Sequence, residues 1–174
     1  MKNDIAQFEQ VLRKAELPRV LLLLGEEDYL KSSALARFEA AWQQKTSELE
    51  RHVLRPAEID AEKLQNLLNT HLLFQKTTFL ILRDADKLTK NVQEQLTQIF
   101  QGPGLVGILV LEFKKLDQRT KLAQLFKQEA LTLECKPLYA NQIPAWISNE
   151  IRRFNKQISQ DAARYLADIS GTEL

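Results

Sequence analysis

The 174 residues suffice for one domain of ordinary size, or for one domain with a small appendage. Apolar residues make up 44% of the chain and charged residues 27%, so the chain can bury a sizeable core and fold. The formal net charge of +1 excludes a whole-molecule field that would attract DNA, RNA or an anionic membrane.

Cysteine and histidine are too few and too scattered for a redox or metal centre. The lone Cys135 excludes an internal disulfide, and with His52 and His71 it makes no metal-ligand spacing. The longest apolar run, Val20–Leu24, is too short to cross a bilayer, and the first residues hold no hydrophobic signal region. We therefore expect a cytoplasmic protein with no membrane partner, no metal and no cofactor.

Strands alternate with helices over the first 135 residues. In chain order, the apolar spacing predicts helices over 5–12, 29–45, 60–69, 91–100 and 117–126, and strands over 19–24, 51–55, 78–82, 106–111 and 131–135. Asp117 is expected to cap the helix that follows it. Because strands alternate with helices of about 10 to 15 residues, the pattern predicts an α/β fold with a parallel sheet flanked by helices.

The pattern changes to helix only after Tyr139. One predicted helical face comprises Ile143, Trp146, Ile147, Ile151 and Phe154. A second helix is expected to start at a Ser159 cap and to end at Gly171, with Ala162, Tyr165, Leu166 and Ile169 facing inward. We therefore predict an α/β domain over 1–139 and part of a small helical domain over 140–174, because two helices alone cannot close a core.

The first predicted strand runs into a segment that resembles a phosphate-binding loop. Such a loop reads G-x-x-x-x-G-K-[ST], with backbone N–H groups and the Lys around the phosphates and the hydroxyl on Mg²⁺. Gly25, Lys31 and Ser32 match this pattern, but Leu30 stands at the second glycine. Its branched side chain restricts the backbone and fills the space that a phosphate needs. The site is interpreted as a degenerate nucleotide site that does not bind.

A second segment, Thr78–Leu88, contains the predicted strand at 78–82 and the charged residues that follow it. In AAA+ ATPases such a strand ends in Asp-Glu, which position Mg²⁺ and the attacking water. Here Arg83 replaces the Asp and Asp84 replaces the Glu, and a guanidinium repels a cation. Two independent defects thus favour the same interpretation, against the alternative of two ordinary strand ends with charged loops.

Six segments in order resemble the delta subunit family of the bacterial DNA polymerase III clamp loader. They are Val20–Leu30, His71–Phe74, Phe79–Leu88, Lys115–Leu122, Lys136–Leu138 with Ala145–Ile147, and Ile158–Ala163. The resemblance covers essentially the whole chain. It implies an AAA+-like fold with a non-functional nucleotide site, a helical lid domain, and a collar domain that would lie beyond Leu174.

The resemblance also implies partners and a contact site. The family is a non-catalytic part of the polymerase holoenzyme, so the implied partners are the sliding clamp (beta subunit), the other loader subunits and, through the complex, DNA. In this family a Leu-Phe pair after a helix enters an apolar pocket of the clamp. Leu73 and Phe74, with Leu72 beside them, fall on that pair. The alternative is that they are core, because Leu64, Leu67 and Leu68 already supply helical spacing.

The sequence therefore favours a clamp-loader delta subunit that helps to open the clamp and has no catalytic residues of its own. An active or residually active P-loop NTPase is the second hypothesis, supported by Lys31 and Ser32 and opposed by Leu30 and Arg83. A third is an α/β scaffold whose Leu-Phe pair is buried in the core.

Overall fold

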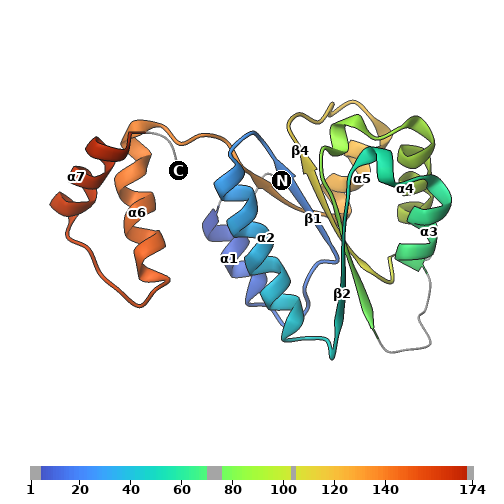
Figure 1. Cartoon of the computed structure of the whole chain (residues 1–174), viewed down its shortest axis with the longest axis horizontal. Helices are drawn as coiled ribbons and strands as arrows, with labels where there is room; N and C mark the ends of the chain where they lie inside the picture. The colour runs from blue at the N-terminus through green and yellow to red at the C-terminus, as the bar shows by residue number, and fades with distance from the viewer. Residues whose placement is uncertain (1–4, 70–75, 103–104, 172–174) are drawn as a thin grey trace. The chain divides into compact units, whose positions relative to one another are not determined.

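The structure is a computed structural model that describes residues 5–69, 76–102 and 105–171. The chain divides into two compact units, Met1–Cys135 and Lys136–Leu174 (Figure 1). The first unit contains a sheet with helices on both faces, and the second contains two helices. In the ranges that the structure describes, no helix is long and apolar enough to cross a membrane.

The helices and strands follow one another in the expected alternation. Their bounds are α1 Ile5–Leu12, β1 Val20–Leu24, α2 Asp28–Gln43, β2 Leu49–Leu54, α3 Ala61–Asn69, β3 Thr77–Leu82, α4 Lys90–Gln101, β4 Ile108–Phe113, α5 Lys121–Glu129, β5 Leu131–Glu134, α6 Ile143–Arg152 and α7 Gln160–Ser170. Short 3₁₀ turns stand at Pro56–Glu58, Ala85–Lys87 and Ala140–Gln142.

The five strands form one parallel sheet in the order β2-β3-β4-β1-β5. The apolar runs of β1, β3 and β4 are buried almost throughout, which is the composition of strands covered on both faces. β2 lies at an edge and is half exposed. Because all strands are parallel, the loops after β1, β3 and β4 meet at the same edge, where α/β sites are built.

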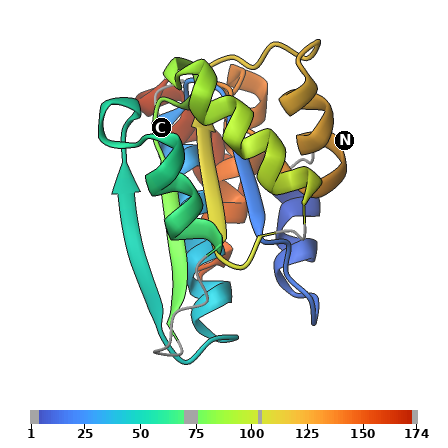
Figure 2. The ribbon, with the colours of Figure 1, turned by 90° about the vertical axis from the view of Figure 1, so that its right-hand side faces the viewer.

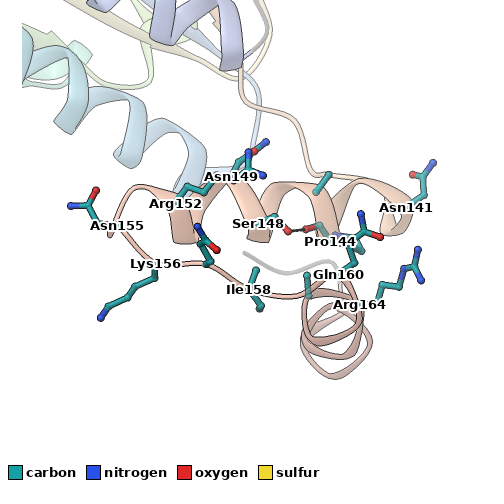
Figure 3. A pocket seen from close by; sticks show the side chains of 13 residues that line it. Asn141, Pro144, Ser148, Asn149, Arg152, Asn155, Lys156, Ile158, Gln160 and Arg164 are labelled. Carbon is teal, nitrogen blue, oxygen red and sulfur yellow. Dashed lines mark hydrogen bonds between the residues drawn. The ribbon is translucent and has the colours of Figure 1, made fainter.

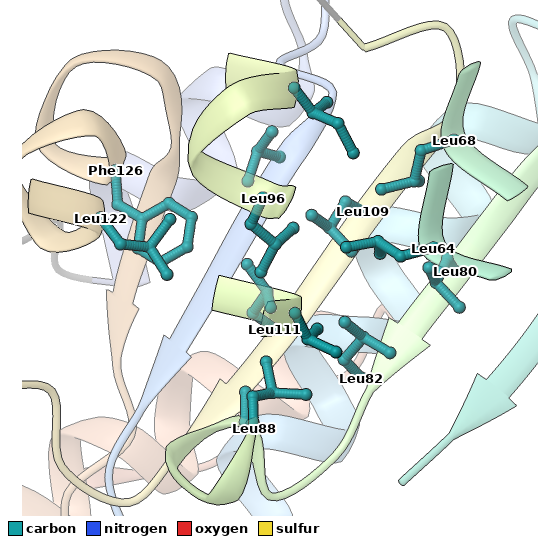
Figure 4. Close-up of a cluster of buried hydrophobic side chains, with 14 of the residues drawn as sticks. Leu64, Leu68, Leu80, Leu82, Leu88, Leu96, Leu109, Leu111, Leu122 and Phe126 are labelled. Atoms are coloured by element: carbon teal, nitrogen blue, oxygen red, sulfur yellow. The ribbon is translucent and has the colours of Figure 1, made fainter. Parts of the chain in front are cut away.

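Helices cover both faces of the sheet (Figure 2). On one face, α3, α4 and α5 pack on alternate leucines of the strands, a cluster drawn in Figure 4 that includes Leu64, Leu80, Leu96, Leu109 and Phe126. On the other face lie α1 and α2, and the ring of Phe38 in α2 stands 6.1 Å from that of Phe79 in β3. The predicted α/β sheet with flanking helices is thus confirmed.

Predicted boundaries of β2, β4 and α5 are wrong by two to four residues, and hydrogen bonds explain the starts of β4 and α5. β4 starts at Ile108 and not at Val106, because the N–H groups of Val106 and Gly107 donate to the Leu68 carbonyl at the end of α3 and do not enter the ladder. The cap of α5 is Thr120, whose Oγ1 accepts from the Ala123 N–H at 3.2 Å. Asp117 instead accepts from the N–H and guanidinium of Arg119, which makes a turn before the helix.

The second unit has a small core. Its buried residues are Ile143, Ile147 and Ala163, packed where α6 and α7 face each other. The predicted Ser159 cap is confirmed, since Oγ accepts from the Ala162 N–H at 3.2 Å, and Gly171 ends α7 at φ 67°.

The predicted inward face of α7 is wrong. Tyr165, Leu166 and Ile169 are exposed, and so is Phe154 after α6. Among the described residues only α6 packs along α7, and a pair of helices buries one narrow stripe, here at Ala163.

We expect amide hydrogen exchange to be faster in α6 and α7 than in β3 and β4. Three buried side chains hold the second unit, whereas a continuous core on both faces holds the sheet. Exchange followed by mass spectrometry on the whole chain measures both segments at once. Equal protection of α6 and the central strands would contradict this expectation.

Candidate functional site

The junction between β1 and α2 is closed by neighbouring strands. The Gly25 N–H donates to the Phe113 carbonyl at the end of β4 at 2.9 Å, and the Glu27 N–H donates to the Cys135 carbonyl after β5 at 2.9 Å. Gly25 has φ 138°, a conformation that suits a residue without Cβ. Two amides that a phosphate-binding loop would turn toward its ligand are therefore engaged within the protein.

Helix α2 begins too early for a phosphate-binding loop. In that motif the helix follows the G-x-x-x-x-G-K segment, whereas here α2 starts at Asp28, three residues before Lys31. Glu27 is the cap, and its carboxylate accepts from the Tyr29 N–H at 3.3 Å. A helix N-terminus is a natural anion site, and here the protein's own carboxylate occupies it.

Leu30, Lys31 and Ser32 lie on the first turns of α2 and face different surroundings. Leu30 is buried in the core, and Ser32 is exposed. Lys31 is only 7% exposed, and its Nζ donates to the Asp28 carboxylate at 2.9 Å. This hydrogen bond and the charge of Lys31 lower the pKa of Asp28. The lysine that would meet a phosphate thus has an internal partner.

The second motif segment turns sharply after β3. The Arg83 N–H extends the pairing of β3 with β2 by donating to the Leu54 carbonyl at 3.0 Å. Asp84 follows in the left-handed region at φ 51°, which aspartate tolerates better than most residues. Its carboxylate accepts from Lys87 at 3.4 Å, and that of Asp86 accepts from the Lys114 N–H at 3.3 Å. The loops after β3 and β4 are thereby joined.

These loops enclose a polar pocket of about 250 Å³ at the carboxyl edge of the sheet. Lys31, Arg83 and Asp84 line it together, whereas Gly25, Leu30 and Ser32 do not. The charged lining residues are Lys31, Arg55, Arg83 and Lys114 against Asp28, Asp84, Asp86 and Glu112. Equal numbers of cations and carboxylates leave no excess positive charge for a polyphosphate.

Glu112, in β4, is a lining residue of this pocket whose ionised form is disfavoured by burial. Burial raises the pKa of its carboxyl, and the charges of Arg83 and Lys31 offset only part of that rise. Cys135 stands near the same junction, where burial raises the pKa of its thiol to about 12, so it is not a thiolate nucleophile. Within the described ranges, no cluster of three or more His, Cys, Asp or Glu side chains could hold a metal ion.

Motif matching alone missed five lining residues of the pocket, Asp28, Arg55, Glu112, Phe113 and Lys114. Arg55 and Lys114 each come directly after a strand. The rule that parallel strands meet at one carboxyl edge could have found both. Asp28 could have been found as an acidic residue three positions before Lys31 on a helix.

The predicted clamp-contacting residues, Leu72, Leu73 and Phe74, lie outside the described residues. The flanking residues are well held. Leu64 and Leu68 on α3 are fully buried, and the Leu68 carbonyl accepts from two N–H groups of the segment before β4. On the other side, Lys76 pairs with Glu48 at 2.8 Å.

A family model described as DNA polymerase III, delta subunit, matches residues 21–136, which hold the junction and both motif segments. The chain belongs to the DNA polymerase III delta subunit family. Within this family, DNA polymerase III subunit delta of Bacillus subtilis (strain 168) is 28% identical over 167 residues, covering 89% of this chain and 48% of that protein. The chain thus spans about half the length of this delta subunit.

Solved structures confirm the fold of this delta-family chain. The DNA clamp loader delta protein of Bacillus subtilis superposes with a TM-score of 0.75 at 23% identity, over 91% of this chain and 50% of that one. A RuvB mutant of Thermotoga maritima gives 0.53 at 19% identity, over 92% and 52%. The predicted AAA+-like architecture is therefore confirmed.

We expect Leu30→Gly, which completes the phosphate-loop consensus of this delta-family chain, to destabilise it strongly. Loss of a buried leucine costs about 2 to 5 kcal/mol, and glycine within a helix costs about 1 kcal/mol more. Urea unfolding measures the change. Ala36→Gly, at an exposed position of the same helix, is the matched control and should show only the helix term. Equal losses in the two variants would mean that Leu30 is not a core residue.

We expect Glu112→Gln to raise the melting temperature near pH 7. Because the folded-state pKa is raised, the folded chain binds this proton more tightly than the unfolded chain. The contribution of the Glu112 carboxyl to the free energy of unfolding is therefore fully present below the usual Glu pKa of 4.5, and it is lost as the pH rises through the folded-state pKa. The gain of the variant should shrink toward pH 3, while Glu94→Gln, an exposed control, should change little. A gain that is independent of pH would contradict this assignment.

Proposed function

We propose that this chain binds a sliding clamp, favours its open ring during DNA replication, and has no ATPase activity of its own. Membership of the delta subunit family supports the first part. The closed β1–α2 junction supports the second, and it is the observation that carries the proposal of a non-catalytic subunit. In this proposal the chain acts mechanically, by holding the clamp in its open form. ATP bound to other loader subunits controls when it does so.

The chemistry of the junction supports the absence of nucleotide. The amides of Gly25 and Glu27 already donate to strand carbonyls, and Lys31 already donates to Asp28. A phosphate would have to break these hydrogen bonds and displace the Glu27 carboxylate from the helix N-terminus. Arg83 adds a fixed positive charge where Mg²⁺ would be coordinated, which disfavours the metal.

The position of Leu73 and Phe74 supports their role as clamp anchors. They follow a helix whose own apolar stripe, Leu64 and Leu68, is already fully buried. Two large apolar side chains can each contribute about 1.5 to 3 kcal/mol when a partner buries them. We include Leu72 in the same contact. In this proposal the partners are the clamp, the other loader subunits and, through the complex, DNA.

A P-loop NTPase is the competing function, and the residue types Lys31 and Ser32 favour it. Their placement does not, because Lys31 is paired inside the protein and Ser32 does not line the pocket at the carboxyl edge. Nucleotide binding separates the two functions.

We expect isothermal titration with ATP and Mg²⁺ to give no binding at millimolar nucleotide. The reason is that the Gly25 and Glu27 amides already donate to strand carbonyls and that the lining of the pocket holds as many carboxylates as cations. Lys31→Ala should give the same flat titration. Micromolar affinity that is lost in Lys31→Ala would establish the NTPase instead.

We expect Leu73→Ala combined with Phe74→Ala to abolish clamp binding while the fold is kept. Truncating two anchors should cost about 4 kcal/mol or more, on the order of a thousandfold in Kd. Surface plasmon resonance on the sliding clamp of the same organism measures the affinity, and thermal melting reports the fold.

The matched control for this test is Tyr139→Ala with Phe154→Ala, which truncates two large side chains that are exposed in the second unit and should leave the affinity unchanged. An unfolded Leu73/Phe74 variant would place the pair in the core. A folded variant that binds the clamp with unchanged affinity would mean that Leu73 and Phe74 do not contact the clamp.

A further inference from the structure

A polar groove runs between α6 and α7 in the second unit (Figure 3). Its volume is about 940 Å³, several times that of the pocket at the sheet edge. The lining comes from the turn before α6, from α6 itself, from the segment that joins the two helices, and from the first turns of α7. Neither the family match, which ends at residue 136, nor the clamp contact accounts for it.

The side chains that line this groove are cations and carboxamides. The cations are Arg152, Lys156 and Arg164, and the carboxamides are Asn141, Asn149, Asn155, Gln157 and Gln160. No Asp or Glu is among the lining residues. The pocket at the sheet edge balances its charges, whereas the lining of this groove holds three cations and no carboxylate, Asp161 beside Arg164 standing outside it. The groove is therefore selective for an anion.

The cations of the groove are available to a ligand. Arg164 has Asp161 as its partner, but the two are 3.8 Å apart and both largely exposed, so that pair is weak. Within the described ranges, neither Arg152 nor Lys156 makes an ion pair. The neighbouring Arg153 is different, because it pairs with Glu150 and does not line the groove.

The cations are spread along the groove and not gathered at one point. Figure 3 places Asn155 and Lys156 at one end, and Asn141 and Arg164 at the other. The groove runs beside α6, a ten-residue helix, which corresponds to about 15 Å at 1.5 Å per residue. A single phosphate would reach only one end, whereas an extended polyanion meets all three cations.

Two exposed aromatic side chains are sequence neighbours of groove residues, and neither is itself part of the lining. Phe154 precedes Asn155 and is 69% exposed, and Tyr165 follows Arg164 and is 68% exposed. Positive charge combined with exposed aromatic rings is the composition of surfaces that track a nucleic-acid backbone and stack unpaired bases. Carboxamides add hydrogen bonds to phosphates, sugars and base edges.

We propose that the α6–α7 groove binds the phosphate backbone of single-stranded DNA directly. The groove itself follows from charge and geometry, and only the choice of DNA as the polyanion rests on the proposed function. In this arrangement Arg152, Lys156 and Arg164 each neutralise a phosphate. The second unit then contacts DNA independently of Leu73 and Phe74, which contact the clamp.

Fluorescence anisotropy of a labelled 15-nucleotide oligo-dT, titrated with the whole chain from 50 to 200 mM salt, tests this proposal. The variant is Arg152→Gln, Lys156→Gln and Arg164→Gln together. We expect at least a tenfold weaker Kd at 50 mM salt. The slope of log affinity against log salt should fall in magnitude by about 2, because each single-strand phosphate contact contributes about 0.7.

The matched control, Arg13→Gln, Lys14→Gln and Lys90→Gln, removes the same charge from exposed positions of the first unit. This control should keep most of the affinity for oligo-dT. Equal losses of affinity in both variants would mean that binding depends on the net charge of the chain and not on the groove, and would overturn the proposal. Should the triple variant misfold by circular dichroism, Lys156→Gln alone should still lower the slope by about 0.7. Tighter binding of polyglutamate than of oligo-dT would assign the groove to an acidic protein and overturn the proposal.

The two proposals fail separately. Loss of oligo-dT binding in the groove variant with clamp binding intact supports both the groove and its independence from the clamp contact. A chain that binds the clamp but no oligo-dT overturns the groove alone. A chain that binds oligo-dT but no clamp overturns the proposed function alone.

Discussion

The hydrogen bonds that close the β1–α2 junction are the constraint on which the rest of the first unit depends. The carbonyls at the ends of β4 and β5 take the N–H groups of Gly25 and Glu27, so the junction has no freedom to wrap around a ligand. The helix then starts at once, with Glu27 as its cap. An active phosphate-binding loop needs the opposite arrangement, with a longer loop and amides left free. The loss of nucleotide in our proposal is therefore a property of the backbone and not of one side chain.

The same closure determines the electrostatics of the sheet edge. Lys31 lies in the first turns of α2 and pairs with Asp28. Its positive charge therefore faces the pocket together with the carboxylate that neutralises it. Arg83 and Lys114 meet Asp84, Asp86 and Glu112 in the same space. The burial of Glu112 shows that the pocket is not optimised for stability, because a carboxyl with a raised pKa opposes folding at neutral pH. The pocket thus lies at the carboxyl edge of the sheet with as many carboxylates as cations in its lining.

The second unit follows a different physical rule. Its core of Ile143, Ile147 and Ala163 is small, and much of its apolar surface on α7 is exposed. A unit with so small a core adds little to the free energy of unfolding of the chain, while most of its side chains are accessible to a partner. Its groove carries only cations and carboxamides, in contrast to the paired charges of the first unit. Weak packing and an unbalanced charged groove together suit a contact surface that a partner completes.

The sequence by itself determined the strand and helix order, because buried parallel strands are apolar throughout and the helices between them carry a periodic stripe. It also located Lys31, Arg83 and Asp84 in one site, since each follows a strand of the same sheet. The tertiary structure alone decided the rest. Val106 and Gly107 leave the ladder because the Leu68 carbonyl accepts from their amides, and α7 exposes Tyr165 and Ile169 because α6 is the one helix of the described chain that packs along it. It also decided that α2 begins at Asp28. That start depends on hydrogen bonds to Phe113 and Cys135, about 90 and 110 residues away in the chain, which no local pattern records.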